Sequence, residues 1–386
     1  MKIILAIGFY ILQPALWVGL IRSYLIYHQR IKRERKLFNS AIYEDFYEGR
    51  HFVRGGLILG ISVSVLLGWF LTVSVGWLIL YQLLVLILLI IVPNLIAAVT
   101  AMALASLLIL NLPSLAFLDP IEDWLGRLGL MSQVTNPLSY LVLMTVTLLL
   151  TGLFIRMNAG KFDSPTIARN TRHTKVAVYR FNELTLIPLL LFVPGDWFSS
   201  DLSFIPFFQI AGHRYAILII PFLLGLKLTV RKSVPRQFFL NLSQTIFYLV
   251  ILGLGLIVIS QFYPQMITPS LAILLGGYYI VIGLAKYRDR QVNFEYSEVM
   301  DGIRVIGIQP GTPAAKMDLK IGDVILSVNG VNVANEDEFY RALSTNATYC
   351  RFKVRDRNDQ LKMTESAIFK NSPHEIGVKT YTQAMK

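Results

Sequence analysis

The chain has 386 residues, of which 54% are hydrophobic and only 16% are charged. Its mean hydropathy of +0.56 is too high for one soluble domain, and its length exceeds that of a single small module. These values exclude a simple soluble enzyme or binding module and predict a polytopic membrane protein.

The positive charge of the chain is unevenly distributed. Residues 287–386 contain 14 basic and 13 acidic side chains, so +11 of the formal net charge of +12 lies in residues 1–286. A basic excess beside apolar segments is typical of membrane topology and of contact with anionic lipid. The distribution therefore argues against nucleic-acid binding, although the total charge alone would suggest it.

Apolar segments fill most of residues 1–286. No Asp, Glu, Lys, Arg or His occurs between Gly55 and Leu118. Since a transmembrane helix needs about 20 apolar residues, three spans fit there. Further spans are expected at Ile3–Leu20, Pro137–Ile155, Leu184–Trp197, Phe204–Val230, Phe238–Phe262 and Met266–Ala285. Residues 1–286 are thus predicted to form a transmembrane domain of about nine helices.

Two basic segments indicate the orientation of this domain. The first, near residues 28–54, contains a cluster of five basic side chains around Glu34, and the second is residues 156–183. By the positive-inside rule both are expected to be cytoplasmic loops. The acidic segment 119–136 and the turn with Asp196 and Asp201 are expected on the outer side. Residues 287–386 then form a cytoplasmic domain, and residues 37–49 form either an interfacial helix or a short connector.

A different pattern begins at Gly302. A short strand, a turn, a small-residue segment, a second strand and a hairpin follow one another at Ile303–Ile308, Gln309–Gly311, Thr312–Met317, Val324–Val328 and Asn329-Gly330. The hairpin is expected because Asn and Gly both accept positive φ. Asn335 and Glu338 have the spacing of a capped helix start, which predicts an amphipathic helix to about Ser344. Two more strands are expected at Tyr349–Arg355 and Leu361–Ala367.

This order of elements resembles a PDZ domain of the bacterial kind, a small α+β fold. The resemblance implies a peptide groove between a strand edge and the helix. The family's carboxylate loop is an apolar-Gly-apolar turn, which here matches Ile376-Gly377-Val378, late in the chain. That position resembles a circularly permuted PDZ domain, with the groove formed by this turn and Phe339, Tyr340 and Leu343. A plain structural strand remains the alternative.

A test of this groove follows from the same resemblance. The substitution Gly377→Trp is expected to block peptide access while leaving the fold mostly intact.

Catalytic patterns are missing from the sequence. Bacterial membrane proteins with PDZ domains are often proteases, yet the five histidines form no His-Glu-x-x-His motif, and Ser62 and Ser64 have no histidine nearby in sequence. Cys350 is the only cysteine, which excludes an internal disulfide and a zinc site of several thiolates. We therefore expect a binding protein, not an enzyme, with no catalytic residues, cofactor or metal site.

The full layout is similar to the MinJ family of cell-division topological determinants, as is the basic segment Arg30–Lys36. The resemblance implies a membrane scaffold that is enriched at division septa and poles. Its implied partners are a DivIVA-like scaffold, a MinD-like ATPase (and so MinC, which blocks FtsZ ring assembly), late divisome proteins and a second copy of the chain.

Two alternatives remain open. One is an adaptor or regulator of membrane proteolysis that presents substrates through the PDZ domain. The other is a transporter with a regulatory PDZ domain. The polar residues Gln13, Gln82 and Asn94 leave room for the second, although helix-to-helix hydrogen bonding is the simpler account of them. The residues themselves predict only a membrane-fixed, peptide-binding scaffold.

Overall fold

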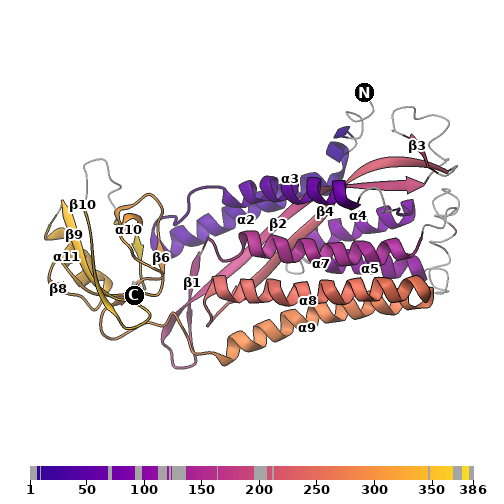
Figure 1. The fold of residues 1–386 in the computed structure, drawn as a ribbon. Helices are drawn as coiled ribbons and strands as arrows, with labels where there is room; N and C mark the ends of the chain where they lie inside the picture. Colours follow the sequence, from indigo (N-terminus) through magenta and orange to yellow (C-terminus); the bar gives the residue numbers. More distant parts are fainter. Residues whose placement is uncertain are drawn as a thin grey trace.

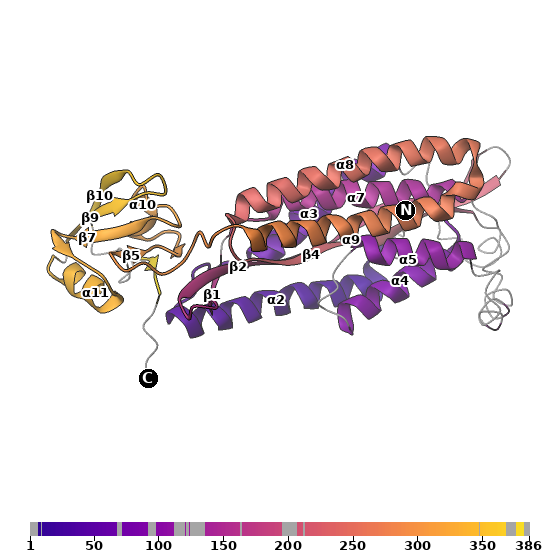
Figure 2. The ribbon, with the colours of Figure 1, turned by 90° about the horizontal axis from the view of Figure 1, so that it is seen from below.

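The computed structural model describes residues 7–8, 10–67, 72–91, 98–111, 120, 123, 136–162, 164–194, 207–210, 213–346, 348–367 and 376–381. Figure 1 shows an elongated helical region with a smaller β-rich domain at one end, and Figure 2 shows the same arrangement from below. The predicted outer turn at 196–201, the polar residue Asn94 and nearly all of the acidic segment 119–136 lie outside the described residues.

Helices occupy most of the predicted apolar segments. They are α2 (Pro14–Phe38), α3 (Tyr47–Leu67), α4 (Val75–Ile90), α5 (Ala98–Asn111), α7 (Leu138–Asn158), α8 (Pro235–Phe262) and α9 (Ile267–Gln291), with the short 3-10 helix η3 (Pro264–Met266) before α9. Among the described residues, three of these segments are long and apolar enough to cross a membrane, namely α7, α8 and η3 with α9. Helices α8 and α9 also expose large apolar side chains such as Tyr248, Ile251 and Ile280, as a lipid-facing surface does.

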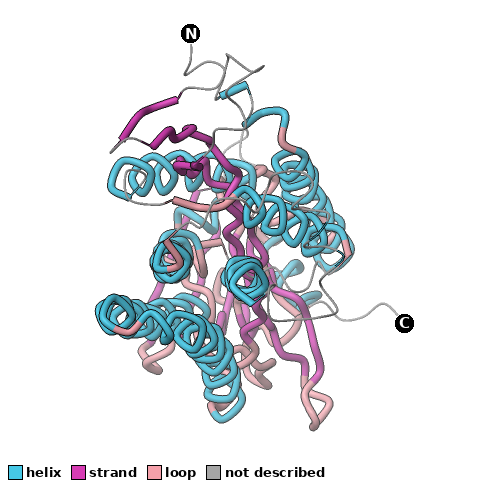
Figure 3. The backbone as a smooth tube through the Cα atoms, turned by 90° about the vertical axis from the view of Figure 1, so that its right-hand side faces the viewer, coloured by secondary structure: helices cyan, strands magenta, loops and turns pink. Residues whose placement is uncertain are grey.

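The expected helices at Leu184–Trp197 and Phe204–Val230 are wrong. The chain forms two long antiparallel strands there, β2 (Lys175–Pro194) and β4 (His213–Val230), with β1 (Pro165–Arg169) and β3 (Phe207–Ile210) at the edges in the order β1-β2-β4-β3. Figure 3 shows these strands running through the helical region with helices around them. The second basic segment is therefore largely strand and helix end, not a loop.

A pair of prolines explains why these apolar segments are strands. Pro188 and Pro221 lie directly opposite each other in the ladder, and a proline inside a helix costs about 3 kcal/mol. Because neither has an N–H, the pair fits only a position without ladder hydrogen bonds, where backbone groups point away from the partner strand. The two prolines thus remove two outward donors from strands that lie among apolar helices.

A serine on α3 forms hydrogen bonds with backbone groups on the outer edge of β2. The Ser64 hydroxyl donates to the Pro188 carbonyl oxygen at 3.1 Å and accepts from the Leu190 amide at 3.0 Å. A Cβ on Gly60 would lie 2.7 Å from Pro188 Cδ, so glycine at this position lets α3 approach the strand closely. Non-helical backbone among apolar segments needs such partners, because an unsatisfied polar group there costs several kcal/mol.

Backbone groups on the outer edge of β4 also form hydrogen bonds with side chains from the helical region. The Tyr81 hydroxyl accepts from the Leu223 amide at 2.9 Å, and Gln13 Nε2 donates to the Ile219 carbonyl at 2.7 Å. Gln82 donates in turn to Gln13 Oε1 at 2.5 Å. The polar side chains on α2 and α4 therefore join helix to helix, as expected, and also bond to the hairpin.

Replacing Ser64 tests this account of the hairpin edge. Ser64→Ala removes two bonds to strand backbone, and we expect a loss of about 1–3 kcal/mol in the free energy of unfolding. Ser62→Ala is the matched control, because among the described residues Ser62 bonds only the Ile58 carbonyl of its own helix. Thermal unfolding of the full chain in detergent micelles measures both variants, and equal stability of the two would contradict this role of Ser64.

The C-terminal domain contains a sheet in the order β10-β9-β7-β5, with β8 on β7, and a separate pair of β11 and β6. Its elements are β5 (Ile303–Arg304), β6 (Gly307–Ile308), α10 (Pro313–Lys316), β7 (Val324–Val328), β8 (Val331–Asn332), α11 (Glu336–Ser344), β9 (Tyr349–Arg355), β10 (Leu361–Ala367) and β11 (Val378–Lys379). The predicted strand 303–308 is divided between two sheets, while the other strands and the helix lie where the sequence predicts them. Phe339 and Phe352 are fully buried in its core.

Candidate functional site

Helix α11, one wall of the predicted groove, is fixed at its start by a reciprocal cap. The Asn335 side chain accepts from the Glu338 amide at 2.9 Å, and the Glu338 carboxylate accepts from the Ala334 amide at 2.8 Å. The Ala334 amide, together with the Asn335 side chain, holds the pKa of Glu338 below its usual range. The cap agrees with the prediction from the sequence. It gives hydrogen-bond partners to backbone amides at the start of the helix that no carbonyl of the helix can reach.

The Asn-Gly hairpin between β7 and β8 positions the other end of α11. Asn329 and Gly330 have φ of 50° and 85°, as expected for this turn. The Asn329 side chain donates to the Ala342 carbonyl at 3.2 Å and accepts from the Arg351 amide at 2.9 Å. One residue therefore ties α11 to β9, which holds the helix in place along the sheet.

Three of the predicted groove residues lie in the buried core of the domain. Phe339, Ile376 and Val378 belong to one buried apolar cluster, and Leu343 packs against it. Tyr340 is 48% exposed and its ring contacts that of Phe339. Figures 1 and 2 show α11 on the side of the domain away from the helical region.

Gly377 adopts a backbone conformation that other residues rarely accept. Its φ is +87°, and a Cβ there would lie 2.0 Å from Thr312 Oγ1. The Gly377 carbonyl accepts from the Gln309 amide at 2.8 Å, and the Ile376 carbonyl accepts from the Ala314 amide at 2.9 Å. The turn is therefore tightly built into the domain.

The strand after this turn has two buried faces. Ile376 and Val378 face the core of the domain, whereas Lys379 and Tyr381 face the helical region, where Lys379 Nζ donates to Ser40 Oγ at 2.6 Å. All residues from 376 to 381 are buried. The segment that the sequence assigns to ligand pairing thus joins the C-terminal domain to the turn between α2 and α3.

Further contacts fix the domain against the start of β2. The Ala177 amide donates to the Tyr296 carbonyl at 2.9 Å, and the Tyr179 hydroxyl donates to the Ile306 carbonyl at 2.9 Å. Val176 and Ser297 form an isolated antiparallel bridge. A small apolar cluster that includes Phe38, Ile42, Tyr179, Tyr296 and Tyr381 fills this interface. The two parts of the chain are therefore packed together through specific contacts.

A buried ion cluster at the end of α2 was not anticipated from the sequence. Arg30 is 4% exposed, Glu34 0% and Glu48 3%. Arg30 Nε lies 2.6 Å from Glu48 Oε1, and Arg30 Nη1 lies 3.2 Å from Glu34 Oε1. The basic cluster predicted for a cytoplasmic loop is therefore part of a helix, and its first arginine points into the protein.

This cluster fixes the turn between α2 and α3. Arg30 also donates to the carbonyls of Tyr43 and Asp45 at 2.7 and 2.9 Å, while Glu34 accepts from the Ile42 amide at 2.8 Å. The turn contacts the C-terminal domain, so the cluster holds the surface on which β11 rests. The spacing of Arg30 and Glu34 by four helical residues was the available signal for it.

A second buried pair joins α3 to β2. His51 Nδ1 lies 2.8 Å from Glu183 Oε2, and both side chains are at most one-tenth exposed. Since Glu183 comes from the segment predicted as a loop, only the strand conformation of β2 brings it to His51. The pair adds a polar contact where helix and hairpin meet.

Cys350, Ser62 and Ser64 all bond to backbone carbonyls. Cys350 is buried on β9, and burial raises the pKa of its thiol, which makes a nucleophilic thiolate less accessible. Ser64 and Ser62 bond backbone carbonyls, as described above. Among the described residues, no group of three or more His, Cys, Asp and Glu side chains could hold a metal ion.

Comparison with known proteins matches both parts of the chain. A PDZ domain family model matches residues 304–356. The cell division topological determinant MinJ of Bacillus subtilis (strain 168) is 27% identical over 376 residues, which cover 96% of this chain and 93% of that protein. The probable cell division topological determinant MinJ of Lacticaseibacillus paracasei is 28% identical over 234 residues, or 58% of this chain and 60% of that protein.

Proposed function

The chain belongs to the MinJ family of cell division topological determinants, and we propose that it is a non-catalytic membrane scaffold of division-site selection. The observation that carries this proposal is the extent of the similarity, since 96% of the chain aligns with a protein of that name. The aligned region includes the helical part and the PDZ domain, so the family similarity does not rest on a widely shared module alone.

We propose that the helical region, residues 1–286, spans the membrane and that the PDZ domain, residues 287–386, is cytoplasmic. Three long apolar helices and the exposed apolar surface of α8 and α9 support membrane insertion. The C-terminal part of α2, strand β1 and the PDZ domain lie at one end of the molecule in Figure 1. Both basic segments reach this end, which is the arrangement that the positive-inside rule favours for a cytoplasmic face.

The proposed role is a bridge between division proteins. A DivIVA-like scaffold would recruit the protein to septa and poles, and the protein would place a MinD-like ATPase there, which prevents FtsZ ring assembly near poles and used septa. The packing of the PDZ domain against the helical region suits this role, because these contacts would hold a partner bound to α11 near the membrane.

We further propose that a peptide segment of one partner binds along α11 next to the Ile376-Gly377-Val378 turn, as in a circularly permuted PDZ domain. The exposed Tyr340 and the half-buried Leu343 provide apolar contacts on the helix. Aromatic side chains at such positions often contribute much of the binding energy.

Cross-linking and pull-down from membranes of dividing cells tests this function. The full-length protein should capture a MinD-like ATPase and a coiled-coil polar scaffold, and the variant Tyr340→Ala/Leu343→Ala should lose one of them. Arg341→Ala is the matched control on the same helix. Arg341 is exposed, and within the described part of the chain its guanidinium hydrogen-bonds only the Asp337 carbonyl. Capture of a membrane protease in place of these partners would favour the adaptor of proteolysis instead.

A further inference from the structure

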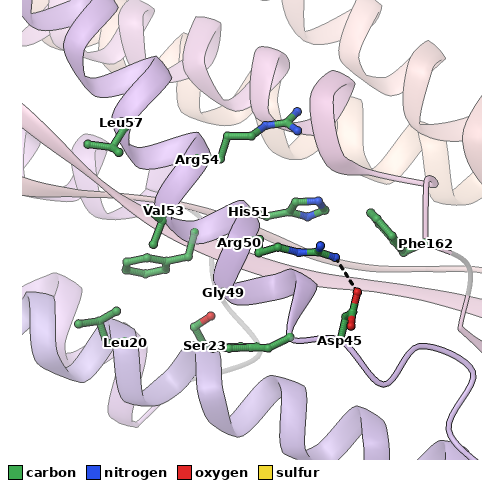
Figure 4. A pocket seen from close by; sticks show the side chains of 12 residues that line it. Leu20, Ser23, Asp45, Gly49, Arg50, His51, Val53, Arg54, Leu57 and Phe162 are labelled. Atoms are coloured by element: carbon green, nitrogen blue, oxygen red, sulfur yellow. Dashed lines mark hydrogen bonds and ion pairs between the residues drawn. The ribbon is translucent and has the colours of Figure 1, made fainter.

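A groove of about 1100 Å³ lies between α2 and α3 near the end that contacts the PDZ domain. Figure 4 shows Leu20 and Ser23 on α2 across from Gly49 and Val53 on α3, with Phe162 at one side. None of the contacts described above for the PDZ domain uses this groove.

One end of the groove is apolar and open. Leu20, Val53 and Leu57 line it, and Val53 and Leu57 are 56% and 52% exposed. Leu57 lies further along α3, toward the middle of the helical region, where exposed Ile61 continues the apolar surface. This end is therefore suited to hydrocarbon.

The other end of the groove is basic. Arg50 and Arg54 line it and lie one helical turn apart, on the same side of α3 as Leu57. Arg50 pairs with Asp45 at 3.2 Å, but both side chains are well exposed, at 64% and 74%. An exposed pair of this kind contributes little stability. A phosphate group could therefore replace the Asp45 carboxylate as the partner of Arg50.

A buried hydroxyl lies between the two ends. Ser23 is 2% exposed and lines the groove, and its Oγ has no hydrogen-bond partner among the residues that the structure describes. Figure 4 shows Ser23 pointing from α2 toward α3. An unpaired buried hydroxyl costs free energy, and a ligand with acceptor oxygens in the groove would satisfy it.

We propose that this groove binds an anionic phospholipid. The Ser23 hydroxyl and the Arg50 guanidinium contact the phosphate, Arg54 adds positive charge at the same end of the groove, and the acyl chains follow Leu20, Val53 and Leu57. The polar end lies toward the PDZ domain and the apolar end toward the middle of the helical region, which is the orientation of a lipid in the cytoplasmic leaflet. The inference rests on the membrane location proposed above.

Native mass spectrometry of the full chain in detergent micelles tests the site, with phosphatidylglycerol and phosphatidylcholine as the two probes. We expect the wild type to bind phosphatidylglycerol more tightly than phosphatidylcholine. The variant Arg50→Gln/Arg54→Gln should bind phosphatidylglycerol about tenfold more weakly, since each basic side chain adds to the attraction for an anionic lipid. Ser23→Ala should weaken binding in the same direction.

The matched control is Lys286→Gln/Arg288→Gln, which removes two exposed charges at the end of α9, outside the groove. It should keep the wild-type affinity. Equal affinity in the groove variant and the control, or displacement of phosphatidylglycerol by millimolar inorganic phosphate, would overturn the lipid site. Membrane fractionation of cells tests the proposed membrane location separately from the lipid site. A chain found outside the membrane would contradict both proposals.

Discussion

Arg30→Ala is expected to lower the free energy of unfolding by about 3–5 kcal/mol, because it leaves buried carboxylates without their cation. Glu34 and Glu48 are almost completely buried and both pair with Arg30. The loss also removes the bonds from Arg30 to the carbonyls of Tyr43 and Asp45, which fix the turn under β11. Thermal unfolding of the full chain in detergent micelles, monitored by size-exclusion chromatography, measures this loss.

Arg50→Ala is the control for this prediction, because it also removes an arginine that pairs with an acid near the same turn. Its pair with Asp45 is exposed, so the expected cost is at most about 1 kcal/mol. If Arg30→Ala is no more destabilising than Arg50→Ala, the buried cluster does not hold the turn.

Gly377→Ala is expected to destabilise the PDZ domain by about 2–5 kcal/mol. The left-handed backbone costs a non-glycine residue about 1–2 kcal/mol, and steric overlap with Thr312 Oγ1, at 2.0 Å from the new Cβ, adds about 1–3 kcal/mol. Hydrogen exchange of the amides in β6 and β11, measured on the full chain, reports this effect locally.

Gly311→Ala separates the two causes. Gly311 also has a positive φ, +77°, but nothing lies within 4 Å of the place that a Cβ would take there, so only the backbone cost of about 1–2 kcal/mol is expected. Equal effects of the two substitutions would show that the contact with Thr312 is unimportant. The same geometry rules out Gly377→Trp as a clean probe of peptide access, contrary to the expectation from sequence, because the larger side chain would disrupt the turn itself.

The C-terminal domain was predictable because its signals are local. The cap at Asn335 and Glu338 and the Asn329-Gly330 turn each determine the backbone within a few residues, and the structure agrees with both. The contact of residues 376–381 with the helical region was not predictable. Alternation of side chains indicates two faces, but only the tertiary fold shows that Lys379 faces Ser40.

The hairpin of β2 and β4 was mistaken for helices because hydropathy over a window does not separate a buried strand from a buried helix. Pro188 and Pro221, which lie near the middle of the two predicted spans, were the missed signal, since proline disfavours a helix interior. The backbone partners of this hairpin, such as Ser64 and Tyr81, come from distant helices, and no local pattern identifies them.

The buried cluster was missed for a different reason. The basic segment near Arg30 was used to predict the cytoplasmic side of the membrane, without asking whether its charges form ion pairs. The partner Glu48 lies eighteen residues away from Arg30 in sequence. Long-range ion pairs of this kind depend on the path of the chain between the partners, which the sequence alone does not specify.

The position of the protein in dividing cells tests the central claim most directly. A fluorescent fusion to the full chain, imaged together with a membrane dye, should be enriched at septa and poles relative to the lateral membrane. A uniform membrane signal in dividing cells, with the fusion protein intact and inserted, would contradict the division-site role.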